Sequence, residues 1–297
     1  MEPTRRLPEH LVRQAQQHAT GGGTPAVPRD ASTVVLLREG DGREGGLEVY
    51  LLRRVAAMAF AGGFCVFPGG GVDPRDADAA IGWAGPSAGE WGRLLGTSTQ
   101  LARALVCAAV RETFEESGVL LAGSTPDTVV ADTTGDDWER DRRLLEAREV
   151  AFTEVLGRRG LVLRTDLLQW WGSWVTPVAE PRRYDTRFFV ARLPPGQVTR
   201  DVSSEAEEVV WLAVRDALDA VDAGRLSMLP PTYVTCLELQ PFRALEEALA
   251  AASLRERSTV EPELVIDADG ARLELPPGPA ALLRARSEPP PAAEGSR

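Results

Sequence analysis

The sequence predicts an α/β (α+β) fold, because segments with the alternation typical of strands are interleaved with segments of helical periodicity. The chain has 297 residues, and 43% of them are hydrophobic, so it can bury a sizeable core. This length is typical of about two domains, or of one elaborated domain with extensions. The sequence shows no internal repeat.

The N-terminal part of the chain predicts a lead-in followed by a hairpin. Residues 1–30 are polar and end in a run rich in Gly and Pro, which favours a flexible segment. Residues 32–40 and 47–54 are β-rich, and the residues between them are mostly Gly or charged. We therefore expect two strands joined by a turn. A glycine-rich stretch, 62–74, follows.

The middle of the chain predicts two helical regions and a pair of strands. A helix with an apolar stripe that includes Leu105 is expected from about residue 100, and Gly118 ends it. Residues 136–160 predict a charged helical region with one solvated face. Residues 167–193 alternate aromatic and polar side chains, which predicts two strands joined by a turn rich in Pro and Arg.

The C-terminal part predicts a strand that leads into a helix at 207–221 and the end of another helix at 245–253. A hairpin around Asp269–Gly270 follows. The chain then divides into a flexible lead-in, a main domain with an insertion, a helix end with a hairpin extension, and a disordered tail rich in Pro and Ala. The respective boundaries are 1–30, 31–245 with the insertion at about 77–100, 246–275 and 276–297.

The composition excludes several kinds of chemistry. All 33 basic residues are arginine, and the chain contains neither lysine nor asparagine. A Walker-type phosphate loop and a lysine Schiff base are therefore excluded. The two histidines, His10 and His18, lie in a polar N-terminal stretch, so we expect neither a histidine-based triad nor a multi-histidine zinc site.

The charge balance bears on partners and location. With 44 acidic residues the net charge is −11, which argues against a nucleic-acid duplex as partner but allows a small phosphorylated ligand bound through a divalent metal. The scattered cysteines Cys65, Cys107 and Cys236 predict buried thiols in a reducing compartment. No secretory signal or membrane-spanning stretch is visible, so we expect a cytoplasmic protein.

Three carboxylates near the end of the central helix are the strongest functional signal. Successive helical residues are rotated by about 100°, so Glu112, Glu115 and Glu116 lie within an arc of about 100°. Like charges at this spacing destabilise a helix, and the helix dipole disfavours anions near a C-terminus. A divalent cation would remove the repulsion, and hard ions such as Mg²⁺ prefer carboxylates. The alternative is an ordinary acidic surface face.

A tight turn upstream, 67–71, reads Phe-Pro-Gly-Gly-Gly and ends an apolar run. It is either a simple loop or a segment whose glycines leave backbone groups accessible to an ion or a diphosphate.

Together these segments resemble the signature of the Nudix hydrolases, G-x5-E-x7-R-E-U-x-E-E-x-G-U, where U is a bulky apolar residue. The second half lies on 111–119, with one Thr outside the apolar class. The first half starts at Gly70 and reaches Asp76 where the pattern has Glu. Between Asp76 and Arg111 there are 34 residues in place of seven, an insertion of 27. Counted backwards from Arg111, the acid position falls on Arg103, so the first acid is either Asp76 or absent.

Within this superfamily, the interrupted signature and a downstream W-x2-W-x-T-P…R-R-Y-D-T-x-F-F segment resemble the coenzyme A diphosphatases of the branch with a long insertion. The resemblance spans roughly residues 32–245. Another coenzyme A branch carries an L-L-T-x-R motif and a second Arg before the glycine turn. Arg54 and Gly63 fit that motif, but Ala59 takes the place of the second Arg. The downstream match consists of Trp171, Trp174, Thr176, Pro177, Arg182, Arg183, Tyr184, Asp185, Thr186, Phe188 and Phe189.

The resemblance implies a Nudix-type α/β/α sandwich with a mixed sheet, and an insertion beside the site where it would shape substrate choice. It also implies a hydrolase for a nucleoside diphosphate-linked substrate. For coenzyme A or an acyl ester the products would be 3′,5′-ADP and phosphopantetheine or acyl-phosphopantetheine. The alternatives are a diphosphatase for ADP-ribose or NADH, and a non-catalytic Nudix fold that binds a regulatory ligand. The intact glutamates argue against the latter.

The resemblance also implies residue roles. Glu112, Glu115, Glu116 and the Gly70 carbonyl would hold Mg²⁺ or Mn²⁺, and either Glu116 or Glu115 would accept the proton of the attacking water. Arg111 would orient these carboxylates by paired hydrogen bonds.

Further residues are expected to complete the site. Glu205 is the preferred candidate for an additional acid from a later loop, although its cluster also fits a solvated strand lead-in. Arg182 and Arg183 could bind a substrate phosphate, such as the 3′-phosphate of coenzyme A, or could be the solvated charges of a turn. Core packing is favoured over adenine stacking for the three tryptophans Trp170, Trp171 and Trp174.

Overall fold

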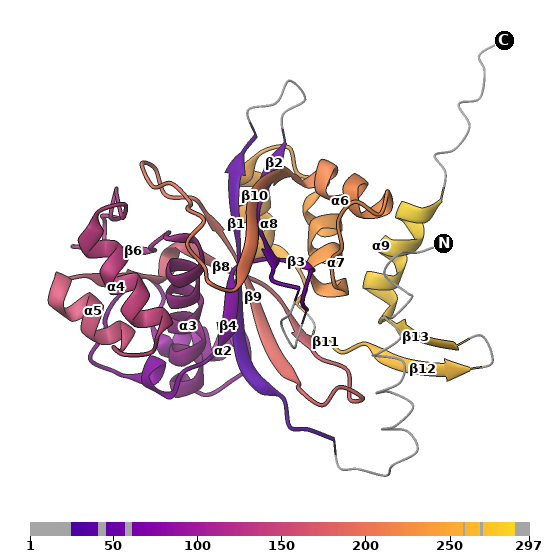
Figure 1. Cartoon of the computed structure of the whole chain (residues 1–297). Helices are drawn as coiled ribbons and strands as arrows, with labels where there is room; N and C mark the ends of the chain where they lie inside the picture. The colour runs from indigo at the N-terminus through magenta and orange to yellow at the C-terminus, as the bar shows by residue number, and fades with distance from the viewer. Residues whose placement is uncertain (1–24, 41–45, 57–60, 258, 268–269, 289–297) are drawn as a thin grey trace.

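The computed structural model of the chain describes residues 25–40, 46–56, 61–257, 259–267 and 270–288. Its centre is a mixed sheet whose strands are β1 (Arg29–Glu39), β2 (Leu47–Arg54), β3 (Cys65–Val66), β4 (Gly69–Gly71), β8 (Leu168–Val175), β9 (Tyr184–Arg192), β10 (Ala206–Ala213) and β11 (Thr259–Val260). The strand order is β10-β2-β1-β9-β8-β11, while β3 pairs with β2 and β4 with β1 (Figure 1). β1 is parallel to β9 and antiparallel to β2.

The central strand β1 is buried on both faces. Val34, Val35, Leu36 and Leu37 have no exposed surface. Successive side chains of a strand point to opposite faces of its sheet. Val34 and Leu36 accordingly belong to one core cluster, and Val35 and Leu37 belong to another. The sheet is therefore the middle layer of a sandwich.

Helices cover both faces of this sheet (Figure 1). One layer consists of α2 (Ala88–Leu95), α3 (Thr99–Ser117), α4 (Asp136–Glu146), α5 (Phe152–Arg159) and a small sheet of β5 (Gly82–Ala84), β7 (Val162–Arg164) and β6 (Ala122–Gly123). The other layer contains α6 (Val214–Asp222), α7 (Pro230–Leu239), α8 (Leu245–Leu254), the hairpin β12 (Glu263–Asp267) and β13 (Gly270–Glu274), and α9 (Pro277–Ser287). The predicted α/β/α sandwich with a mixed sheet is confirmed.

Helix α3 is the structural support of the acidic cluster. The Ser98 hydroxyl accepts a hydrogen bond from the Leu101 amide and caps its start. Gly118, with a φ of 75°, ends it in the left-handed conformation that glycine adopts without strain. Leu105 and Phe114 are fully buried against the sheet side of this layer. The helix predicted from about residue 100 to Gly118 is thus present.

Other predicted elements are also present. β1 and β2 form the expected antiparallel pair, and β8 and β9 form the second one. β10 leads directly into α6. β12 and β13 pair as the expected C-terminal hairpin. Residues 1–24 and Asp269 lie outside the described residues.

Three predictions need correction. The region 136–160 is two helices, α4 and α5, because Arg148 between them has a φ of 58° and interrupts the helical path. The segment 245–253 is a whole helix, since α8 starts at Leu245. The tail predicted as disordered from 276 contains α9, which Leu283 anchors in the core with 5% of its surface exposed.

The insertion at 77–100 folds against α3. It contributes the end of a 3₁₀ helix, η1 (Pro74–Ala77), then β5 and α2. Trp91 of α2 is 2% exposed and meets Phe189 of β9 edge-to-face, with ring centroids 5.7 Å apart. Within the described part of the chain, no helix is long and apolar enough to cross a membrane.

Candidate active site

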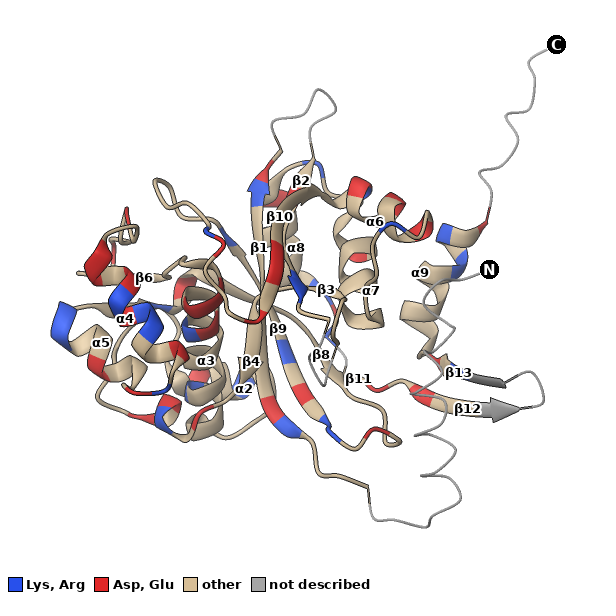
Figure 2. Cartoon of the chain, viewed as in Figure 1, with Lys and Arg blue, Asp and Glu red and all other residues tan. Residues whose placement is uncertain are grey.

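The glutamates of α3 face the glycine strand β4. The Gly69 amide donates a hydrogen bond of 2.7 Å to the Glu116 carboxylate. A Cβ atom at Gly70 would lie 2.5 Å from Glu112 Oε1, which is closer than side chains tolerate. Glycine is therefore needed at this position, because the carboxylate packs directly on the backbone. Figure 2 shows the acidic residues of α3 beside the central strands.

Arg111 joins the two halves of the interrupted signature. Its Nε and Nη2 each lie 3.0 Å from an oxygen of Asp76, and Nη2 also donates to the Gly71 carbonyl at 2.9 Å. Nη1 donates to Glu112 at 2.8 Å and to Glu115 at 3.1 Å. One planar guanidinium thus fixes three carboxylates and the glycine strand at once.

Asp76 is the residue at the first acidic position. It is 2% exposed and lies in η1, where it forms a reciprocal capping box with Asp73. The other candidate, Arg103, stacks on Trp83 instead, with its guanidinium carbon 4.8 Å from the ring centroid. The residue spacing left the first acid of the signature as either Asp76 or absent. Asp76 takes this position, because its carboxylate pairs with Arg111.

The environment of the three glutamates disfavours their charged form. Burial, and then the charge of Glu112, raise the pKa of Glu116 well above its usual value. Burial also raises the pKa of Glu112, although Arg111 opposes the shift. For Glu115, burial raises the pKa to about 7 against the attraction of Arg111. Such carboxylates gain from any cation placed among them.

The donor set fits a hard divalent ion, since carboxylates and exposed backbone groups are the ligands such ions prefer. Among the residues that the structure describes, however, no three acidic, His or Cys side chains are gathered in a metal-holding arrangement. The guanidinium of Arg111 and the amide of Gly69 satisfy carboxylate oxygens there. The chemistry of the cluster therefore suits a metal, and the ligand roles of these residues stay predictions.

A pocket of about 880 Å³ opens from this cluster. Its volume lies in the upper part of the range of roughly 300–1,000 Å³ typical of small-molecule sites. The walls come from α3, β4, the start of β9, the start of α7 and the C-terminal hairpin. No residue of 77–100 lines it. The insertion therefore packs on α3 without lining the pocket, and the expectation that it shapes substrate choice beside the site is not supported.

Comparison with known proteins agrees with this geometry. The family model described as the NUDT19 Nudix domain matches residues 94–239. The chain is 27% identical to the acyl-coenzyme A diphosphatase NUDT19 of Gallus gallus, over 84% of this chain and 78% of that protein. It is 28% identical to putative nudix hydrolase 7 of Caenorhabditis elegans, over 62% of this chain and 52% of the relative.

A solved structure supports the same assignment. The crystal structure of a NUDIX hydrolase from Alicyclobacillus acidocaldarius aligns with a TM-score of 0.64 and 29% identity, covering 76% of this chain and 96% of that one. By these comparisons the chain is similar to the Nudix hydrolases, in sequence over its central region and in its fold. It is accordingly a hydrolase that acts on diphosphate bonds, and Nudix hydrolases generally use divalent metals.

Glu205 lines the same pocket as the α3 glutamates. Its carboxylate accepts a hydrogen bond of 2.8 Å from Arg54, and its charge contributes to the raised pKa values of Glu112 and Glu116. The neighbouring Glu208 lies on β10 and instead faces Arg53 at 3.9 Å. Of the acidic residues Glu205, Glu207 and Glu208, Glu205 is the one that lines the pocket.

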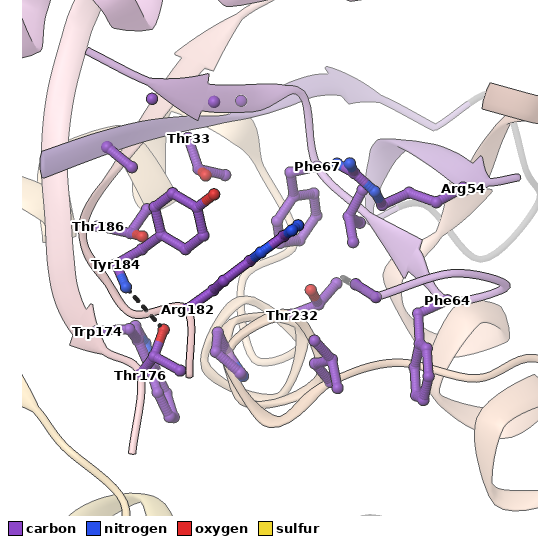
Figure 3. Close-up of a pocket in the computed structure, with 18 of the residues that line it drawn as sticks. Thr33, Arg54, Phe64, Phe67, Trp174, Thr176, Arg182, Tyr184, Thr186 and Thr232 are labelled. Atoms are coloured by element: carbon purple, nitrogen blue, oxygen red, sulfur yellow. Dashed lines mark hydrogen bonds between the residues drawn. The ribbon is translucent and has the colours of Figure 1, made fainter. Parts of the chain in front are cut away.

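The two adjacent arginines predicted to bind phosphate have different surroundings. Arg182 is exposed and lines the pocket, and Figure 3 shows its guanidinium extending across the pocket toward Phe67 and Arg54. Arg183 is 8% exposed and donates to the carbonyls of Thr176 and Ala26. We correct the prediction for Arg183, because its guanidinium is committed to protein groups.

The tryptophans pack mainly as expected. Trp171 is 2% exposed, and its indole donates to Glu238. Trp174 is 7% exposed and yet contributes to the pocket wall. Arg54 is a pocket residue to which the sequence reasoning gave no role, although its fit to the coenzyme A motif was a signal. The pocket residues of α7 and of the hairpin gave no recognisable signal in the sequence.

Proposed function

We propose that this hydrolase cleaves the diphosphate of coenzyme A or an acyl-coenzyme A in a metal-dependent reaction. The products would be 3′,5′-ADP and phosphopantetheine or its acyl ester. The observation that carries the proposal is that the glutamates of α3 line one pocket together with the guanidinium groups of Arg54 and Arg182. The likeness to the acyl-coenzyme A diphosphatase of Gallus gallus supports this substrate class.

Glu112, Glu115, Glu116 and the Gly70 carbonyl would hold Mg²⁺ or Mn²⁺. The bound ion would neutralise diphosphate oxygens and lower the pKa of a water. Either Glu116 or Glu115 would accept that proton, which their raised pKa values favour. Arg111 keeps the carboxylates oriented through its bonds to Glu112 and Glu115.

The remaining pocket groups would position the substrate. Arg182 would bind a phosphate of the substrate, because a planar guanidinium matches phosphate oxygens. In this proposal Arg54 replaces Arg183 as its partner, since Arg54 lines the pocket. Glu205, held by Arg54, would supply the additional acid near the glutamates of α3.

The decisive experiment is a mass-spectrometric product assay on coenzyme A, ADP-ribose and NADH, with Mg²⁺, Mn²⁺ or a chelator. Phosphopantetheine as the fastest product, lost with the chelator, is expected. Cleavage of ADP-ribose or NADH alone would discard the coenzyme A substrate. Glu116→Gln should lower kcat by roughly 10³-fold or more if Glu116 is a metal ligand or base. The matched control is Glu149→Gln, an exposed residue outside the pocket, which should keep full activity.

A further inference from the structure

The C-terminal segment 259–275 borders the pocket although it lies beyond the matched family region, which ends at residue 239. β11 adds to the edge of the central sheet, where Val260 pairs with Trp174 of β8. The chain then enters the hairpin β12–β13 (Figure 1). Pro262, Leu264 and Leu273 of this segment line the same pocket as the glutamates of α3.

The segment is fastened at both ends. At its start, Glu261 accepts a hydrogen bond of 2.5 Å from Arg183, whose other donors reach the carbonyls of Thr176 and Ala26. Beyond its end, Arg286 of α9 pairs with Asp219 and, at 2.8 Å, with Asp222 of α6. A hairpin held in this way keeps a fixed wall beside the pocket.

The two faces of the hairpin differ. Leu264 and Leu273 are direct cross-strand partners, so their side chains lie on one face, and both line the pocket. The next pair, Val265 and Arg272, lies on the opposite face and does not line it. The side of the hairpin that meets the pocket is therefore its leucine face.

This apolar wall continues onto another element. Pro230 and Pro231 at the start of α7 line the pocket with the two leucines and Pro262. These five residues, which we name the C-terminal wall, carry no charge and offer no side-chain hydrogen bond. The wall contrasts with the glutamates and arginines that line other parts of the same pocket.

We propose that the C-terminal wall binds the acyl chain of an acyl-coenzyme A, and that the Arg183–Glu261 pair positions it. This inference rests on the proposed function and assigns a specificity determinant to it. An acyl chain has no hydrogen-bonding groups along its length, so an uncharged wall stabilises it by burial. Each buried methylene group strengthens binding by about fourfold. The wall would thereby make longer esters better substrates than free coenzyme A.

The test compares free coenzyme A, its acetyl ester and a long-chain ester in the full-length protein. For the wild-type enzyme, KM should fall as the chain lengthens. Leu264→Ser should raise KM for the long-chain ester roughly tenfold more than KM for free coenzyme A. Val265→Ser is the matched control on the opposite face and should leave the chain-length dependence intact. Glu261→Gln should act in the direction of Leu264→Ser, because it weakens the pair that positions the wall.

Thermal melting of each variant distinguishes loss of the fold from loss of the wall. If Leu264→Ser does not fold, Leu273→Ser replaces it on the same face. Equal KM changes for all three substrates, or equal effects of the Leu264 and Val265 variants, would overturn the wall while leaving the proposed function in place. If none of the coenzyme A compounds is hydrolysed, the proposed function fails and this inference fails with it.

Discussion

The two ends of the pocket are built in different ways. At the acidic end, consecutive turns of one helix carry Glu112, Glu115 and Glu116. A single arginine fixes the first two beside a glycine strand, and an amide of that strand holds the third. At the other end, the walls come from segments far apart in the sequence, the start of α7 and the hairpin after β11. The comparison shows that a chemical motif can be local while the surface that selects its substrate is assembled by the fold.

Two buried arginines, Arg111 and Arg183, illustrate the difference between the two ends of the pocket. Arg111 bonds only to groups of the acidic end, whereas Arg183 ties a strand, the N-terminal segment and the C-terminal segment together. We expect the loss of Arg111 to lower catalysis and stability, and the loss of Arg183 to change the shape of the pocket.

The largest effect is expected for Arg111→Ala. The change leaves Asp76 buried without its cation, which should lower the free energy of unfolding by about 3–5 kcal/mol. It also frees Glu112 and Glu115, so kcat should fall sharply. Urea denaturation and steady-state kinetics measure both quantities. Arg183→Ala is the comparison, and a kcat loss as large as that of Arg111→Ala would contradict the division between the two ends.

An intermediate effect is expected for Gly70→Ala. The added methyl group would lie 2.5 Å from the Glu112 carboxylate and must displace it. A shift of about 1 Å in a catalytic group costs roughly 10²-fold in rate, which is the loss of kcat expected here. Gly71→Ala is a matched control on the same strand, because nothing lies within 4 Å of a Cβ there. Similar losses in both variants would show that the strand, and not the contact with Glu112, is what the substitution disturbs.

The smallest effect is expected for Arg182→Ala. Removal of one phosphate-binding guanidinium should raise KM for coenzyme A roughly tenfold, and should raise KM for its dephospho form less. The measurement is a pair of saturation curves for each protein. Equal increases for both substrates would remove Arg182 from recognition of the 3′-phosphate.

The sequence predicted the acidic end well because its geometry follows from helix periodicity. The spacing of Glu112, Glu115 and Glu116 placed them on one arc before any tertiary structure was known, and Gly118 marked the end of the helix. Asp76 was harder, because its contact with Arg111 spans the insertion and depends on how η1 packs.

The other end could not be predicted from local pattern. Arg182 and Arg183 are adjacent and chemically identical, and only the path of the chain before β9 decides which one faces the pocket and which one is buried. The hairpin was predicted from its turn, but the leucine face that meets the pocket depends on where β11 joins the sheet. Both features depend on tertiary packing, which the periodicity of the sequence does not determine.

The pairing of Asp76 with Arg111 has a consequence for how such sites are found. The insertion separates the two residues in sequence, and yet η1 returns the carboxylate to the guanidinium at 3.0 Å. In this chain the motif is therefore complete as an arrangement in space and not as a continuous string. The matched family region starts at residue 94 and so omits Gly70 and Asp76 altogether. Searches that require fixed spacing will overlook chains of this kind, whereas searches for a buried acid paired with the helix arginine will find them.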